Sequence, residues 1–138
     1  MEVMKNENSL RRQAFGMSVA LGVQFILGTA VNLFVTFPES GGPGVMWEFA
    51  NHQPLVMAHV IFGTLLLIGA IAFVVMATRR KEQMWKKISW IGLLFILLAW
   101  GSGERFVTTQ IDAFSFSMAI AFILAILTYL WGIFRVNP

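Results

Sequence analysis

The stretch PLVMAHVIFGTLLLIGAIAFVVMA, residues 54–77, has no Asp, Glu, Lys or Arg at any of its 24 positions. A helix of about 20 residues crosses the hydrocarbon core of a bilayer. Only helices and closed barrels satisfy every backbone polar group in lipid, and barrel strands alternate apolar with polar residues. Because this stretch is continuously apolar, it predicts a transmembrane helix.

Three more stretches have the same character. Residues 14–37 also lack charged side chains, and residues 88–107 and 113–134 are rich in apolar ones. The chain is 57% hydrophobic and only 12% charged, which is unusual for a soluble domain of 138 residues. We therefore expect one membrane domain over residues 14–134, with short flanking segments over residues 1–13 and 135–138.

The connections between these spans predict the topology. Few residues separate the second span from the third, and the third from the fourth, and short loops join antiparallel neighbours. The expected fold is all-α, an up-down-up-down four-helix transmembrane bundle. The loop after the first span is longer. Its segment VMWEFANH, residues 45–52, is expected to form a short helix on the outer surface, with Val45, Met46 and Phe49 facing lipid.

Basic residues mark one side of the membrane, because cytoplasmic loops carry an excess of Lys and Arg. That side carries Lys5, Arg11, Arg12, Arg79, Arg80, Lys81, Lys86, Lys87 and Arg135, whereas the other carries Arg105 with Glu39, Glu48, Glu104 and Asp112. Both termini are therefore expected in the cytoplasm, in a multi-pass protein of the plasma membrane. This topology explains the net charge of +3 without a nucleic-acid partner.

Aromatic residues gather near the ends of the spans, where Trp and Tyr commonly anchor helices at the membrane–water interface. We expect Trp47 at the outer interface. The inner belt is expected to contain Trp85, Trp90, Tyr129 and Trp131.

Polar side chains inside the spans are the candidate functional residues, because they are costly in lipid and face the protein interior. Gln24, Gly28 and Asn32 recur every four residues and share one face of the first span. At about 1.5 Å per residue, Asn32 and His59 lie within about 8 Å of the outer boundary. The sequence predicts one polar layer centred on His59 and made of Gln24, Asn32, His59, Ser102, Ser115 and Ser117.

Charged residues are expected to form a rim above this layer. Its members are Glu48, His52, Glu104, Arg105 and Asp112. Arg105 is expected to clamp the outer loop by pairing with Asp112, Glu48 or Glu39. Binding of an anion or a substrate by Arg105 is the alternative.

His59 has four interpretations. The leading one is packing, with the imidazole hydrogen-bonded to Asn32 or Ser102. A b-type haem would use His59 as an axial ligand, with Met118 as a candidate second ligand. A divalent metal would use His59 with Glu48 and His52, which share a helix face at four residues' spacing. The fourth interpretation is a proton relay from His59 toward Gln24, but no ionisable residue lies farther inward to continue the path.

Four segments resemble a group of small bacterial four-helix membrane proteins. They are QFILGTAVNLFVTFP (residues 24–38), HVIFG (59–63), GSGERFV (101–107) and DAFSFSMAIAF (112–122). This resemblance implies a four-span inner-membrane protein and supplies no activity. A looser likeness to b-type haem bundles extends to the number of helices and to a histidine followed by a glycine.

These observations favour a non-enzymatic membrane module with an outward-facing polar layer, serving a partner or an assembly. No catalytic residue, resident metal or cofactor is predicted. One alternative is a redox or haem-handling protein that binds haem b through His59. A second is a carrier for a small solute. The expected partners are the lipid bilayer and another membrane protein or a second copy of this chain.

Overall fold

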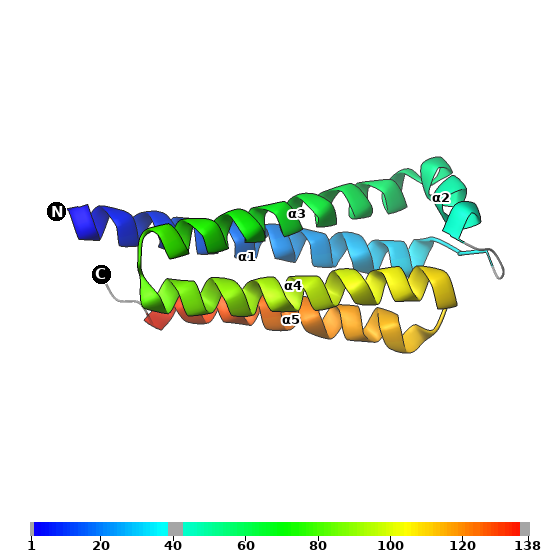
Figure 1. Cartoon of the computed structure of the whole chain (residues 1–138). Coiled ribbons are helices and arrows are strands. Elements are labelled where there is room, and N and C mark those ends of the chain that lie inside the picture. The colour runs from blue at the N-terminus through cyan, green and yellow to red at the C-terminus, as the bar shows by residue number, and fades with distance from the viewer. Residues whose placement is uncertain (1, 39–42, 136–138) are drawn as a thin grey trace.

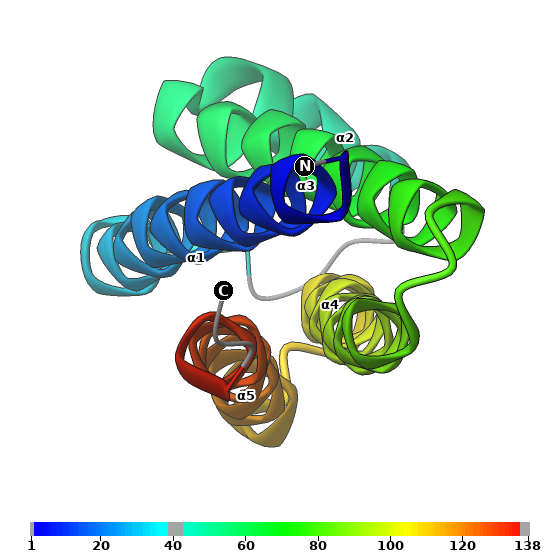
Figure 2. The same cartoon turned by 90° about the vertical axis from the view of Figure 1, so that its left-hand side faces the viewer.

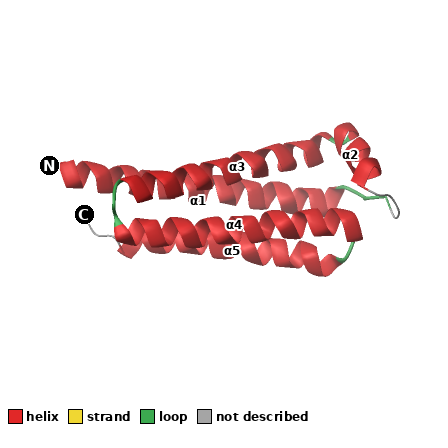
Figure 3. Cartoon of the chain, in the orientation of Figure 1, coloured by secondary structure: helices red, strands yellow, loops and turns green. Residues whose placement is uncertain are grey.

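The computed structural model describes residues 2–38 and 43–135, and five helices make up most of this part of the chain. They are α1 (Glu2–Phe34), α2 (Pro43–His52), α3 (Pro54–Arg79), α4 (Gln83–Thr109) and α5 (Asp112–Arg135). Figure 3 shows that these helices are joined by loops, with no strand in the described ranges. The expected all-α class is confirmed.

Four of the helices are long and apolar enough to cross a membrane. Their apolar parts are Asn8–Phe34, Pro54–Arg79, Gln83–Thr109 and Asp112–Arg135. Each is longer than the roughly 20 residues that a bilayer requires. The four expected spans are therefore present as helices, and they indicate a multi-pass membrane protein.

The four long helices lie side by side, with α1 against α3 and α5, and α4 against α3 and α5. Figure 1 shows the beginning of α1 and the end of α5 at one end of the molecule, which we call the terminal end, and α2 at the other, the α2 end. Figures 1 and 2 both show α3 diverging from α4 toward the α2 end. This divergence leaves room between the α1–α3 pair and the α4–α5 pair.

The helix ends follow from local chemistry. α3 begins at Pro54, whose missing N–H costs nothing in the first turn of a helix. The turn before α4 contains Lys81 at φ 59°, and α4 is followed by Gln110 at φ 54°. These left-handed residues reverse the chain within a few positions, at a cost of about 1–2 kcal/mol for a residue that is not glycine.

Large aromatic side chains close the terminal end of the core. Phe73, Trp85 and Tyr129 are at most 1% exposed, and the Phe73 ring lies 5.6 Å from that of Tyr129 and 6.1 Å from that of Trp85. The expectation of an interfacial belt is therefore wrong for Trp85 and Tyr129, although Trp90 and Trp131 are exposed. Glycines explain the burial, because Tyr129 packs on Gly92, and Trp85 packs with Ile88 on Gly132.

The short helix α2 covers the other end of the core. Ala50 of α2 packs with Val31 of α1 and Val56 of α3 in a small apolar cluster. Met46 is only 4% exposed, so the expectation that it faces lipid is wrong, whereas Val45 is exposed. α2 therefore turns Met46 toward the long helices and covers part of the interior.

Candidate functional site

The polar centre of the molecule is a hydrogen-bonded pair, Gln24 on α1 and His59 on α3. Gln24 Nε2 lies 3.1 Å from His59 Nδ1 and 2.9 Å from the His59 carbonyl oxygen. An amide NH₂ group has two hydrogens, and these two contacts use both of them. The same amide nitrogen lies 3.5 Å from His59 Nε2, so the ring nitrogen that accepts depends on the tautomer of the imidazole.

Two glycines let these side chains fit between the helices. A Cβ atom on Gly28 of α1 would lie 2.9 Å from His59 Cε1, and one on Gly63 of α3 would lie 2.8 Å from Gln24 Nε2. Each polar side chain thus occupies the space beside a glycine on the opposite helix. Small residues allow this close approach of helix backbones.

Gln24 retains an unused hydrogen-bond acceptor. The residue is only 2% exposed, and its Oε1 atom has no hydrogen-bond partner within the described part of the chain. Buried polar side-chain atoms nearly always have a partner. Gln24 Oε1 is thus an unpaired acceptor beside the partly buried imidazole of His59.

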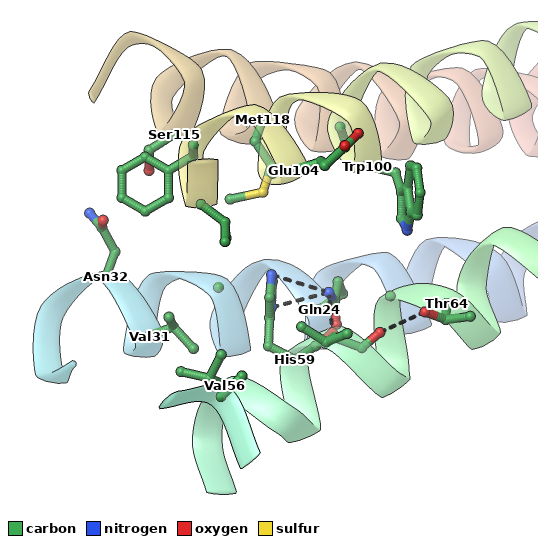
Figure 4. Close-up of a pocket in the computed structure, with 18 of the residues that line it drawn as sticks. Gln24, Val31, Asn32, Val56, His59, Thr64, Trp100, Glu104, Ser115 and Met118 are labelled. Atoms are coloured by element: carbon green, nitrogen blue, oxygen red, sulfur yellow. Dashed lines mark hydrogen bonds between the residues drawn. The ribbon is translucent and has the colours of Figure 1, made fainter. Parts of the chain in front are cut away.

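The pair lies against a cavity of about 350 Å³ between the α1–α3 and α4–α5 pairs. Figure 4 shows the His59 ring extending from α3 into this space, with Met118 of α5 on the opposite side. Most of the lining is apolar. Its buried members include Val31, Met46, Ala50, Val56, Leu66, Ile96, Ala99 and Phe122.

Exposed residues mark the mouth of the cavity. Those with exposed side chains are Asn32, Trp47, Thr64, Trp100, Glu104 and Thr108. Most of them come from α2, α3 and α4, on the side where α3 diverges from α4 (Figure 1). Figure 4 shows Trp100 and Glu104 on one face of α4, with Thr64 across the space on α3. The cavity therefore has a buried polar floor and an aromatic mouth that contains one carboxylate.

The structure brings together four of the six residues expected in the polar layer. Gln24, Asn32, His59 and Ser115 line the cavity, whereas Ser102 and Ser117 do not. Ser117 is exposed, because two residues turn a helix by about 200° and two serines at that spacing face different directions. The expected partners of His59 were Asn32 or Ser102, but the side chain that bonds it is Gln24.

The expected rim is dispersed over the surface. Glu48, His52, Arg105 and Asp112 are exposed and lie outside the cavity lining, which Glu104 joins. The described residues show no ion pair of Arg105 with Glu48 or Asp112, and Glu39 lies outside those residues. Within them, no group of three or more His, Cys, Asp or Glu residues is arranged to hold a metal ion.

Sequence reasoning missed the aromatic part of the site. Trp47 and Trp100 line the cavity with Glu104, but a tryptophan near a helix end is usually interpreted as an interface anchor. The spacing of Trp100 and Glu104, four residues on one helix, was the available signal that they share a face. No protein-family model matches the chain, and neither a curated protein nor a solved structure is significantly similar to it.

Proposed function

We propose that this protein is a non-enzymatic membrane module that binds a small amphiphile in the cavity at its α2 end. The observation that carries the proposal is that Gln24 and His59 both line a cavity of about 350 Å³, and that the enclosed Oε1 atom of Gln24 has no partner in the described structure. A ligand that shifts the Gln24 side chain enough to donate a hydrogen bond to this enclosed atom removes the cost of leaving it unpaired, about 1–3 kcal/mol.

The lining supports a particular kind of ligand. A group that both donates and accepts, such as a hydroxyl or a primary amide, matches the amide of Gln24 together with the imidazole of His59 in either tautomer. The mostly apolar walls match a hydrocarbon body. Small-molecule sites have volumes of roughly 300–1,000 Å³ and combine apolar walls with a few polar groups, as this cavity does.

The distribution of charge supports a cytoplasmic terminal end and an up-down-up-down order of the spans. The basic residues predicted in the cytoplasm lie in or beside the helix ends opposite α2, so the positive-inside rule directs the cavity outward. The same reasoning favours the plasma membrane. A carrier needs a path that continues inward, and the buried Phe73, Trp85 and Tyr129 occupy the core there.

Photolabelling tests the binding proposal. The protein is placed in phosphatidylcholine nanodiscs with an octanol that carries a diazirine, and the adducts are mapped by tandem mass spectrometry. We expect adducts on the residues that line the cavity. Ser115→Phe, which fills the cavity from α5, should remove them. Gln24→Leu should weaken labelling about fivefold, because one hydrogen bond contributes about 1 kcal/mol.

The matched control is Ser117→Phe. It adds the same ring to the same helix, but at an exposed position outside the cavity lining, so labelling should persist. The proposal would be contradicted if adducts were spread over the lipid-facing surface and the labelling yield were the same in Ser115→Phe as in the unmodified protein.

The alternative haem-binding function has one supporting observation, which is that His59 and Met118 line the same cavity from α3 and α5. Histidine with methionine is a known axial pair for haem iron. The absorption spectrum of the purified protein separates the two functions. A Soret band that disappears in His59→Ala would establish haem binding and displace the amphiphile proposal.

A further inference from the structure

A carboxylate and two indoles share the mouth of the cavity. Glu104 and Trp100 lie on α4, and Trp47 lies on α2. Trp47 is 58% exposed and Trp100 is 52% exposed, so much of each ring is free for contact. Glu104 is exposed, and no salt bridge satisfies its carboxylate within the described part of the chain.

The charge among the described residues that line the cavity is negative. Among the described lining residues, Glu104 is the carboxylate, and none of the others is a Lys or an Arg. Arg105 follows Glu104 in the sequence, but adjacent helix residues do not face the same way, and Arg105 is not in the lining. A carboxylate at a membrane interface attracts a cation more strongly than it does in bulk water, because the local dielectric constant is lower.

We infer that the ligand is a cationic amphiphile, whose positively charged nitrogen lies at Glu104 and Trp100 while its apolar body fills the cavity. The inference rests on the proposed function and names the ligand class. An organic ammonium group gains charge attraction from the carboxylate and a cation–π contact from the indole face. Its other end carries a polar group that meets Gln24 and His59 in the lining of the same cavity.

Two probes of the same shape isolate the role of charge. (6-Hydroxyhexyl)trimethylammonium and 7,7-dimethyloctan-1-ol share the hydroxyl and the six-carbon chain, and differ in having nitrogen or carbon at the branched end. Each competes with the diazirine octanol for the protein in nanodiscs, at matched free aqueous concentrations. We expect the cation to displace the label at about tenfold lower concentration, which corresponds to about 1.4 kcal/mol.

Variants then assign this preference to residues. Glu104→Gln should abolish it, and Trp100→Leu should reduce it. Glu48→Gln is the matched control, because Glu48 is an exposed carboxylate at the same end of the molecule but outside the cavity lining. The preference for the cation should survive in that variant. A preference that Glu48→Gln removes as fully as Glu104→Gln would show general surface attraction and overturn the inference.

The results of these competition experiments distinguish failure of this inference from failure of the proposed function. If both probes displace the label at equal concentrations, and Gln24→Leu weakens both, the cavity binds amphiphiles and the inferred cation site is wrong. If neither probe displaces the label from the cavity residues, the proposed function fails as well. A preference that persists in Glu104→Gln also contradicts the assignment of the charged nitrogen to Glu104.

Discussion

Gln24 and His59 each fill the space beside a glycine on the other's helix, and they join there by a hydrogen bond of 3.1 Å from Gln24 Nε2 to His59 Nδ1. The bond also fixes the amide, because its second hydrogen is donated to the His59 carbonyl oxygen at 2.9 Å. The same contact therefore packs α1 against α3 and joins two polar residues that line the cavity.

The first prediction concerns the coupling between these two side chains. In a double-mutant cycle of Gln24→Leu and His59→Leu, the interaction free energy should be about 0.6–1.5 kcal/mol in favour of the native pair. The measurement is the free energy of unfolding in bicelles, obtained by steric trapping. A cycle that closes within error of zero would show that the two residues contribute independently to the stability of the protein.

The second prediction concerns the glycines of the pair. Gly28→Ala places a methyl group 2.9 Å from His59 Cε1, so the ring must move. We expect Gly28→Ala to lower the free energy of unfolding by about 1–3 kcal/mol relative to Gly22→Ala, as overpacked sites do. Gly22 is the control on the same helix, because a Cβ there meets nothing within 4 Å. Equal stability of the two variants would refute the tight fit.

The third prediction concerns the terminal end of the core. A Cβ on Gly92 overlaps the ring of Tyr129, a side chain that is 0% exposed. Gly92→Ala should therefore cost about 1–3 kcal/mol of stability. Gly101→Ala on the same helix should cost nothing, because a Cβ there meets no atom within 4 Å. Thermal unfolding of both variants in detergent makes the comparison, and a Gly92→Ala protein as stable as Gly101→Ala would contradict the packing.

The fourth prediction concerns the hydroxyl of Tyr129. It is buried, and within the described part of the chain it has no hydrogen-bond partner. Tyr129→Phe should leave stability unchanged or raise it by up to about 1 kcal/mol, because no bond is lost and a buried polar group is removed. Tyr129→Ala should be strongly destabilising through lost packing. Destabilisation by Tyr129→Phe above about 1 kcal/mol would reveal a partner for the hydroxyl.

The four apolar helices were predictable from the sequence, whereas the contacts between them were not. The absence of charged residues over residues 54–77 is a property of one segment, so it identifies α3 without knowledge of its neighbours. The burial of Tyr129 depends instead on Gly92, which lies on another helix. Which glycine faces which aromatic ring is set by the relative height and rotation of the helices, and a single sequence does not contain that information in readable form.

The same limit applied to the site. The inward position of Gln24 and His59 was predictable because polar side chains are costly in lipid, whereas Asn32 is exposed at the mouth of the cavity. The partner of His59 was mistaken because Asn32 lies eight residues, or about 12 Å along the helix axis, beyond Gln24. Only the packing of α1 on α3 selects between them. Trp100 was missed because the cavity that it lines depends on how far α3 diverges from α4.

The most direct test of the outward cavity and its polar floor uses a single cysteine, since the chain has none of its own. Ser115→Cys should react with a membrane-impermeant methanethiosulfonate added outside intact cells. Octanol should slow that reaction, and should do so less in combination with Gln24→Leu. Ser117→Cys, outside the lining, should gain no protection. Labelling of Ser115→Cys only after the membrane is permeabilised, or equal slowing of both cysteines by octanol, would contradict the account.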